Sequence, residues 1–293
     1  IYNPVAGKGR AAELIGKITD AIREKGYEPV VYSTVGGQED YDFLKAANLD
    51  SYDLIICSGG DGTLNGIAGF ICRTGCKTPF GYIPAGSTND FAHSLGLNHD
   101  IMGALDEILS SKKCVSIDTG LLEDSPFFYV AAFGAITRIT YTTPQKEKKR
   151  FGYFAYVYRA VKELFPINEY SLKVEAGQHS FEGKVAAAII SNSHYVGGFK
   201  IIQNEKANLS DGLFEVLFIK KPKNIFSTIS VAFALASHKL NRKHMIAFQT
   251  DRITVTGTDE NREIDWNLDG EYGGTYKKAT VRVCPGSLNM RMR

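Results

Sequence analysis

In the first part of the chain, up to about residue 115, short apolar runs alternate with stretches of helical periodicity, and glycine-rich turns follow the apolar runs. Strands are predicted at 1–3, 29–32, 53–57 and 80–84, and helices at 11–25, 39–47, from about 63 and at 89–95. This alternation is typical of an open parallel α/β layer. Ligands of such layers bind at the carboxyl edge of the sheet, where the glycine turns fall.

The pattern changes after about Val115, where most apolar runs are strand-like and separated by turn signals. Strands are predicted at 115–122, 127–133, 171–175, 185–191, 213–220, 252–256 and 279–283, and helices at 149–165 and 224–239. We therefore expect an α/β domain over 1–120 and a β-rich, sandwich-like domain over 121–293, with the last few residues able to return to the first domain.

Composition excludes several classes of protein. Hydrophobic residues make up 44% of the 293 residues, as in a folded globular chain, and a net charge of +2 gives no strong attraction to nucleic acid. No apolar run approaches the roughly 20 residues of a membrane span, and no segment resembles a signal peptide. We expect a cytoplasmic protein.

The most informative segment is Gly59-Gly60-Asp61-Gly62-Thr63, which follows an apolar run. Glycines let backbone N–H groups approach phosphate oxygens, and the start of the following helix favours negative charge. Asp61 beside phosphates indicates a Mg²⁺ ion between them. The alternative is an ordinary strand–turn–helix corner with Asp61 as the helix N-cap.

Two other segments fit the same ligand. The run Asn3-Pro4-Val5-Ala6-Gly7 offers further backbone donors, and Lys8 and Arg10 follow it. These cations could neutralise a triphosphate or form a solvated helix start. The hydroxyl groups of Ser87 and Thr88 could bind phosphate or ribose, or cap the next helix.

Three segments together resemble the catalytic domain of diacylglycerol kinases, and these are Asn3–Gly9, Gly59–Thr63 and Pro84–Ala92. The Gly59–Thr63 segment alone is also similar to sphingosine kinases, NAD kinases and phosphofructokinases, whereas Gly86–Phe91 separates the chain from NAD kinases. The resemblance is to the minimal bacterial type and implies an ATP-dependent lipid kinase of phospholipid metabolism with an active-site cleft between two domains. The nucleotide contacts that it implies are Asn3, Pro4, Val5, Ala6, Gly7, Thr34, Gly60, Asp61, Gly62, Thr63, Leu64, Asn65, Gly66 and Ser87.

A metal site is implied further along. Residues 193–202 and 207–216 are similar to a family stretch in which an aspartate and backbone carbonyls hold a structural Mg²⁺ ion. By this resemblance Asp211 is a ligand, with the carbonyls of Asn208 and Leu213 beside it. The chain departs from many relatives at 203–205, where they carry a proline. On its own, Asp211-Gly212 would be a β-turn.

The segment Asn267–Glu271 resembles the family stretch whose glutamate is the general base. Transfer of phosphate to a lipid hydroxyl needs a group that orients the hydroxyl and takes its proton, and Glu271 is the candidate. Outside this context it would be a surface residue. The resemblance further implies a carboxylate network that needs Mg²⁺ or shared protons, formed by Asp61, Asp90, Asp118 and Asp211.

The lipid is expected to meet the chain near a basic cluster at 145–150 and an aromatic helix at 151–165, with Phe151, Tyr153 and Tyr156 as membrane contacts. The alternative is a core-facing helix with a solvated basic start. If the basic cluster and the aromatic helix do meet the lipid, the protein contacts the inner face of the membrane peripherally. The sequence is also compatible with a homodimer. An NAD kinase-like phosphotransferase and a non-catalytic lipid- or nucleotide-binding module are the competing functions.

Overall fold

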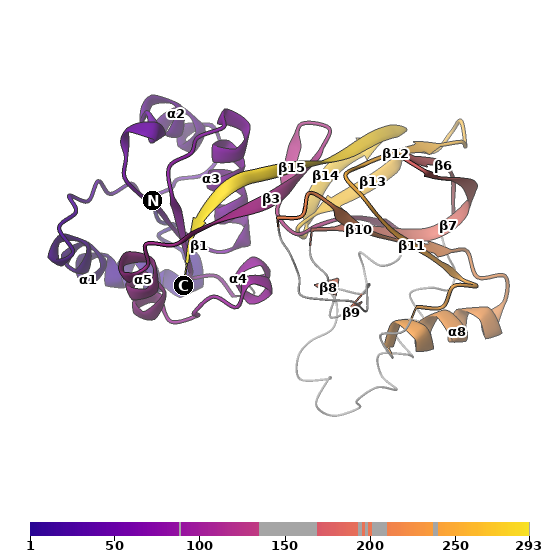
Figure 1. The fold of residues 1–293 in the computed structure, drawn as a ribbon, viewed down its shortest axis with the longest axis horizontal. Coiled ribbons are helices and arrows are strands. Elements are labelled where there is room, and N and C mark those ends of the chain that lie inside the picture. Colours follow the sequence, from indigo (N-terminus) through magenta and orange to yellow (C-terminus); the bar gives the residue numbers. More distant parts are fainter. Residues whose placement is uncertain are drawn as a thin grey trace. The chain divides into compact units, whose positions relative to one another are not determined.

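The computed structural model describes residues 1–87, 89–134, 169–192, 195–196, 199–200, 210–236 and 240–292. The chain forms two compact units. We call Ile1–Thr119 with Pro285–Arg293 the N-terminal unit and Gly120–Cys284 the C-terminal unit. Figure 1 shows helices and strands mixed in the first and strands predominating in the second, which confirms the predicted fold class of an α/β part followed by a β-rich part.

The sheet of the N-terminal unit is parallel. Strand β1 (Ile55–Gly59) pairs with β2 (Phe80–Pro84), and Met290 at the end of β15 (Lys278–Arg291) pairs with the other edge of β2. On the β1 side, Tyr2 bridges both Ser58 and Ser33. The strand expected at 29–32 is wrong. The Tyr2 N–H donates to the Tyr32 carbonyl and the Thr34 N–H donates to the Tyr2 carbonyl, which makes an isolated bridge at Ser33 and not a strand.

Helices lie on both sides of this sheet (Figure 1). They are α1 (Arg10–Glu24), α2 (Gln38–Ala46), α3 (Asp61–Thr74), α4 (Asp90–Leu95) and α5 (Ile101–Ser110), with short 3-10 turns at Ala6–Gly9 and Leu49–Ser51. Apolar residues of α1 and α5 share one hydrophobic cluster with Ile83 of β2. Helix α5 was not predicted; it begins after Asp100, whose carboxylate accepts a hydrogen bond from the Gly103 N–H at 2.9 Å.

The C-terminal unit is built from antiparallel strands. They are β4 (Ser125–Phe127), β5 (Val130–Gly134), β6 (Tyr170–Ala176), β7 (His179–Ser191), β10 (Phe214–Lys220), β11 (Met245–Thr250), β12 (Arg252–Gly257), β13 (Ile264–Leu268) and β14 (Glu271–Tyr276), with the short β8 (Tyr195–Val196) and β9 (Phe199–Lys200). Strand β3 (Cys114–Leu122) and β15 contribute residues to both units. Strand β7 pairs with β6, β5 and β10, so it is the central strand that links the others of this unit.

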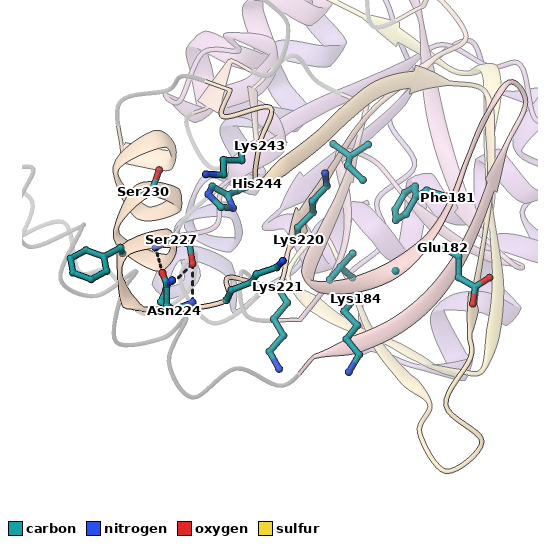
Figure 2. Close-up of a pocket in the computed structure, with 15 residues that line it drawn as sticks. Phe181, Glu182, Lys184, Lys220, Lys221, Asn224, Ser227, Ser230, Lys243 and His244 are labelled. Atoms are coloured by element: carbon teal, nitrogen blue, oxygen red, sulfur yellow. Dashed lines mark hydrogen bonds between the residues drawn. The ribbon is translucent and has the colours of Figure 1, made fainter.

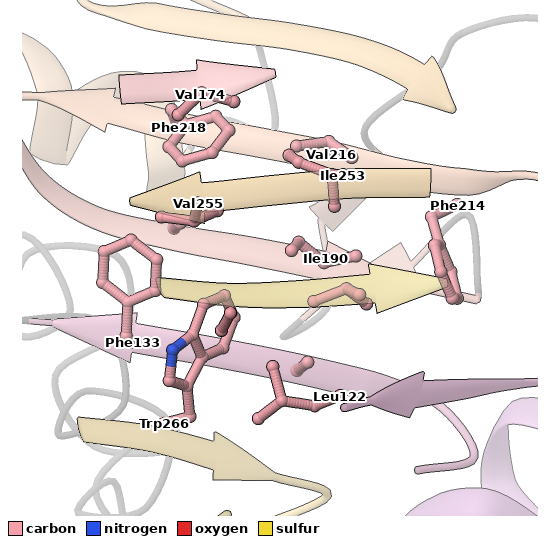
Figure 3. Close-up of a cluster of buried hydrophobic side chains, with 14 of the residues drawn as sticks. Leu122, Phe133, Val174, Ile190, Phe214, Val216, Phe218, Ile253, Val255 and Trp266 are labelled. Atoms are coloured by element: carbon pink, nitrogen blue, oxygen red, sulfur yellow. The ribbon is translucent and has the colours of Figure 1, made fainter. Parts of the chain in front are cut away.

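Side chains from these strands fill one hydrophobic core (Figure 3). Trp266 of β13 packs edge-to-face against Phe133 of β5, with ring centroids 4.9 Å apart. The inward residues alternate with outward ones, as the burial pattern of β6 shows, because successive side chains of a strand point to opposite faces. This core fixes the hairpin formed by β13 and β14.

The single strand expected at 127–133 is two strands, because the chain leaves the ladder at Phe128 and Tyr129. The helix predicted at 224–239 is observed as α8 (Ile225–Ala236). The helix expected at 149–165, the basic cluster at 145–150 and the proposed contacts Phe151, Tyr153 and Tyr156 lie outside the described residues. Within the described part of the chain, no helix is long and apolar enough to cross a membrane.

Candidate functional site

Three loops of the N-terminal unit meet at the carboxyl ends of β1 and β2. A Cβ atom on Gly86 would lie 2.5 Å from the Cα atom of Gly60, and a Cβ atom on Gly7 would lie 2.1 Å from the carbonyl oxygen of Ala85. Both distances are far shorter than van der Waals contact, so the loops approach this closely only because these residues lack side chains. The structure therefore brings together the three segments singled out in the sequence.

Hydrogen bonds fix the loops to one another. The side-chain amide of Asn3 donates to Thr63 Oγ1 at 2.9 Å, and its carbonyl accepts from the Val5 N–H at 3.0 Å. The Ala85 N–H donates to the Gly59 carbonyl at 2.8 Å. Asn3 thus links the first loop to the start of α3.

The loop after β2 is closed by Asn89, which is buried and has a left-handed φ of 52°. Its side chain accepts from the Gly86 N–H at 2.9 Å and donates to the Gly86 carbonyl at 3.0 Å. Ser87 is exposed at the tip of this turn. Thr88 and the side chain of Asp90 lie outside the described residues.

Asp61 is the first residue of α3, and Gly60 occupies the N-cap position without a side-chain hydrogen bond. The reading of Asp61 as an N-cap is therefore wrong. Its Oδ1 accepts from the Phe91 N–H at 3.3 Å, which ties α3 to α4. Burial, together with the Asp61 charge, raises the pKa of Tyr82, whose hydroxyl donates to the Gly59 carbonyl at 3.1 Å.

Two glycines on α3 have no packing reason to be glycine. Gly62 and Gly66 are exposed, and a Cβ atom on either would meet nothing within 4 Å. Glycine inside a helix costs roughly 0.5–1 kcal/mol relative to alanine. These positions keep the surface of α3 open beside the three loops, as a ligand that lies against the helix backbone requires.

Thr34 is buried, and its N–H donates to the Tyr2 carbonyl at 2.9 Å. The loop that follows is held by Asp40, which sequence analysis missed. The Asp40 carboxylate accepts from the N–H groups of Val35 and Gly36, each at 3.0 Å, and from the Tyr32 hydroxyl at 2.9 Å. Asp40 therefore orders the segment next to the proposed Thr34 contact.

Asp118 is 1% exposed, so its carboxylate is inside the protein. Its Oδ1 accepts from the Gly286 N–H at 2.7 Å. In the described part of the chain, no group of three or more histidine, cysteine or acidic side chains is placed to hold a metal ion. The carboxylate network of Asp61, Asp90, Asp118 and Asp211 stays a prediction.

In the C-terminal unit, Glu271 begins β14 and is exposed. It pairs with Leu268 of β13 across a two-residue turn, in which Asp269 and Gly270 have φ angles of 48° and 104°. Two successive positive φ angles define a type I′ turn, for which Asp-Gly is a preferred sequence. The tight hairpin presents the Glu271 carboxylate at its end.

Asp269 clamps this hairpin and is the second residue that sequence analysis missed. Its buried carboxylate accepts from the backbone N–H groups of Phe128, Tyr129 and Val130 at 2.6, 2.9 and 2.8 Å. Its own N–H donates to the Val130 carbonyl at 2.9 Å. These bonds explain the break between β4 and β5, and they fix the position of the neighbouring Glu271.

Asp211 is exposed, and its Oδ1 accepts from the Leu213 N–H at 3.0 Å, with Gly212 at a φ of 74°. This is the geometry of a turn. The oxygen donors of Asp211 and the Leu213 carbonyl suit a hard cation such as Mg²⁺, which would keep several waters on such a small donor set. Asn208, the third proposed ligand, lies outside the described residues.

Known proteins share both parts of the chain. The sequence model of the diacylglycerol kinase catalytic domain matches residues 1–122. That of the YegS C-terminal NAD kinase beta sandwich-like domain matches residues 131–292. A diacylglycerol kinase of Bacillus subtilis (strain 168) is 31% identical over 276 residues, which cover 94% of this chain and 89% of the relative. The chain belongs to the diacylglycerol kinase family.

Other diacylglycerol kinases are similar to this chain in sequence or in fold. A diacylglycerol kinase of Staphylococcus epidermidis (strain ATCC 12228) is 30% identical, covering 94% of this chain and 85% of its own length. The crystal structure of a diacylglycerol kinase from Bacillus anthracis str. Sterne has the same fold, with a TM-score of 0.73, 19% identity and coverage of 100% and 95%. The resemblance inferred from the motifs is confirmed.

The open helix surface of this diacylglycerol kinase family member can be tested with Gly62→Ala. We expect unchanged or slightly higher thermal stability, because alanine favours the helix, and a KM for ATP raised about tenfold, because the methyl group occupies ligand space. Gly16→Ala on α1 is the matched control, since a Cβ atom there also meets nothing within 4 Å. An unchanged KM in Gly62→Ala would contradict a nucleotide on α3.

The Asp269 clamp predicts a loss of stability for Asp269→Asn. The substituted amide places donors against backbone N–H groups, so we expect a free energy of unfolding lower by about 2–4 kcal/mol, measured by urea denaturation. Asp265→Asn is the control, because Asp265 is exposed on the same hairpin. Equal stability of the two variants would show that the three hydrogen bonds do not hold the hairpin.

Proposed function

We propose that this chain is an ATP-dependent lipid kinase that transfers the γ-phosphate to a primary hydroxyl of a membrane lipid, with diacylglycerol as the favoured acceptor. The observation that carries the proposal is the convergence of three loops around the exposed start of α3, with Gly62 and Gly66 left open. Relatives named diacylglycerol kinase supply the acceptor class.

The N-terminal unit is proposed to bind ATP. The loop Asn3–Gly7 and the start of α3 would surround the phosphates, and the N–H groups of the first helical turn would bind them. Within the loop, the N–H groups of Asn3, Val5 and Ala6 are already bonded to protein oxygens, and Pro4 has none. The hydroxyl of Ser87 is exposed for a further contact. Asp61 would hold Mg²⁺ on the triphosphate, and the ion supplies neutralisation of phosphate charge when bound.

The C-terminal unit is proposed to supply the base. Glu271 takes the proton of the lipid hydroxyl as its oxygen forms a bond to the γ-phosphorus. The bond between the γ-phosphorus and the oxygen that bridges to the β-phosphate breaks, and ADP leaves with that electron pair. Asp269 keeps Glu271 in place through the three backbone hydrogen bonds that it accepts.

A second Mg²⁺ is proposed at Asp211, with the carbonyls of Asn208 and Leu213, in a structural role. A peripheral contact with the cytoplasmic face of the membrane follows from the lipid acceptor. The expected role is in phospholipid metabolism. A homodimer is compatible with this function but is not required by it.

An NAD kinase-like activity is the alternative, because the family model of the second part is described as NAD kinase beta sandwich-like. Incubation with labelled MgATP, a panel of lipids in mixed micelles and NAD⁺ separates the two. Label in a lipid supports the proposal and names the acceptor. Label in the dinucleotide alone would replace the proposal by the alternative, and no transfer to any acceptor would favour a binding module.

A further inference from the structure

Helix α8 (Ile225–Ala236) presents an apolar face to solvent. Its twelve residues include no charged side chain. Phe226 and Ile229 are 78% and 46% exposed, and their spacing of three residues places them on one side of the helix. Val231 and Ala232, on the other side, are fully buried. The exposed side of α8 is thus as apolar as the buried side.

The start of this helix is well defined. The Asn224 side chain accepts from the Ser227 N–H at 2.9 Å, and the Asn224 N–H donates to Ser227 Oγ at 3.0 Å. This reciprocal pair satisfies backbone donors at the helix start, as a capping box does. The apolar stripe is therefore held on a capped helix.

A basic pocket of about 1080 Å³ adjoins the stripe (Figure 2). Phe226, Ser227 and Ser230 of α8 line one part of it. Five lysines from the neighbouring strands and loops line the rest, and these are Lys184, Lys220, Lys221, Lys223 and Lys243. We call the stripe and these lysines together the α8 face.

Positive charge is concentrated at the α8 face. Among the residues that the structure describes, Glu182 is the one carboxylate in the pocket lining, and Glu169 forms ion pairs with Lys184 and Lys221. The whole chain has a net charge of only +2. The neighbouring His244 also senses this positive charge: burial, and then the charges of Lys243 and Lys220, lower the pKa of its imidazole.

We propose that the α8 face is a docking surface for a bilayer that contains anionic phospholipids. Aromatic and aliphatic side chains on one side of a helix, flanked by lysines, are typical of helices that lie in the membrane interface. The apolar stripe enters the acyl boundary while the lysines bind headgroup phosphates. The proposal rests on the proposed function, because a kinase acting on a membrane lipid must reach the bilayer.

Charge favours this occupant over a second copy of the chain. A two-fold dimer through the α8 face would bring the same patch of each copy together. The lysines of one copy would then lie near those of the other, and like charges repel. An anionic bilayer instead offers a partner of opposite charge and an apolar interior.

Co-sedimentation with vesicles tests the proposal. One variant, Phe226→Ser/Ile229→Ser, removes the stripe, and another, Lys223→Glu/Lys243→Glu, reverses two charges. The controls are Val30→Ser, at a valine that is 61% exposed, and Lys17→Glu/Lys112→Glu, at exposed lysines of the N-terminal unit. All proteins are assayed on phosphatidylcholine vesicles with and without phosphatidylglycerol, and for kinase activity on short-chain diacylglycerol in detergent micelles.

We expect the wild type and both controls to bind the anionic vesicles. The charge variant should bind them at least tenfold more weakly, because each lysine near the surface contributes about fivefold to the affinity. The stripe variant should bind them about tenfold more weakly. Activity in micelles should be retained by all. Vesicle binding at the wild-type level in both variants would overturn the proposal. If, in addition, the wild type is a dimer and the stripe variant a monomer, the α8 face would be a surface for self-association instead.

The same experiment separates this proposal from the proposed function. Loss of vesicle binding in the variants, with no kinase activity in micelles for any protein, would leave the docking surface standing and remove the lipid kinase activity. Full activity in micelles for all proteins, with vesicle binding unchanged in the variants, would support the lipid kinase activity and remove the docking surface. Thermal unfolding of each variant confirms that the exposed substitutions leave the fold intact.

Discussion

Replacing Glu271 with Gln is expected to lower kcat by about 10²–10⁴, the contribution of a general base. Among the described residues, the Glu271 carboxylate makes no hydrogen bond or ion pair, and it is exposed at the start of β14. Glutamine has nearly the same shape but cannot accept the proton of the lipid hydroxyl. The KM for ATP and the thermal midpoint should therefore stay at wild-type values.

The control for this variant is Glu263→Gln, which makes the same chemical change at an exposed residue of the C-terminal unit. This control should turn over at the wild-type rate. A rate within a few-fold of wild type would remove Glu271 from the mechanism.

Replacing Asp61 with Asn should lower kcat by about 10²–10³, as expected when one charge interaction with the reacting phosphates is lost. The fold should be retained, because asparagine keeps the acceptor that binds the Phe91 N–H. The negative charge at the first position of α3 contributes about 0.3–1 kcal/mol to stability, so a small decrease in the free energy of unfolding is also expected.

Asp100→Asn is the matched control for Asp61. Asp100 also lies at the start of a helix of the N-terminal unit, where its carboxylate accepts from the Gly103 N–H at 2.9 Å. Asparagine is an equally good N-cap, so the variant should lose only the same small helix-dipole contribution as Asp61→Asn, and its turnover should not change. Similar turnover in the two variants would show that Asp61 acts only as a residue of the helix start.

Local signals were sufficient for much of the N-terminal unit. The apolar run at 80–84 is β2 at the predicted bounds, and the glycine turn of Gly59 and Gly60 joins β1 to α3 as expected. Helix α5 was missed although Asp100 and apolar residues at helical spacing were there to be read. Its glycine at position 103 weakens that pattern.

Long-range contacts explain the other misses. The break between β4 and β5 depends on the Asp269 carboxylate, which is about 140 residues further along the chain from Tyr129. Asp-Gly is a preferred sequence for a type I′ turn, but such a local pattern does not tell which backbone groups the aspartate carboxylate binds. Asp40 differs, because its three donors lie only four to eight residues upstream. An acidic residue in the first turn of a helix is common, so its presence in α2 does not indicate that it holds the preceding loop.

The apolar face of α8 also illustrates this limit. The sequence predicts the helix from its spacing, but which side faces solvent depends on how α8 packs onto the strands. The lysines that surround it come from β7, from β10 and the segment after it, and from the turn before β11, and the sequence separates them by up to about 60 residues. Only the folded chain gathers them.

The most direct test of the account is the fate of the terminal phosphate of ATP. Radiolabelled MgATP and diacylglycerol in mixed micelles are incubated with the protein, and the organic phase is resolved by thin-layer chromatography. We predict label in phosphatidic acid, formed in proportion to the ADP released. Release of labelled inorganic phosphate or labelling of a soluble acceptor, with none in the lipid, would contradict the central claim that this chain phosphorylates a lipid hydroxyl.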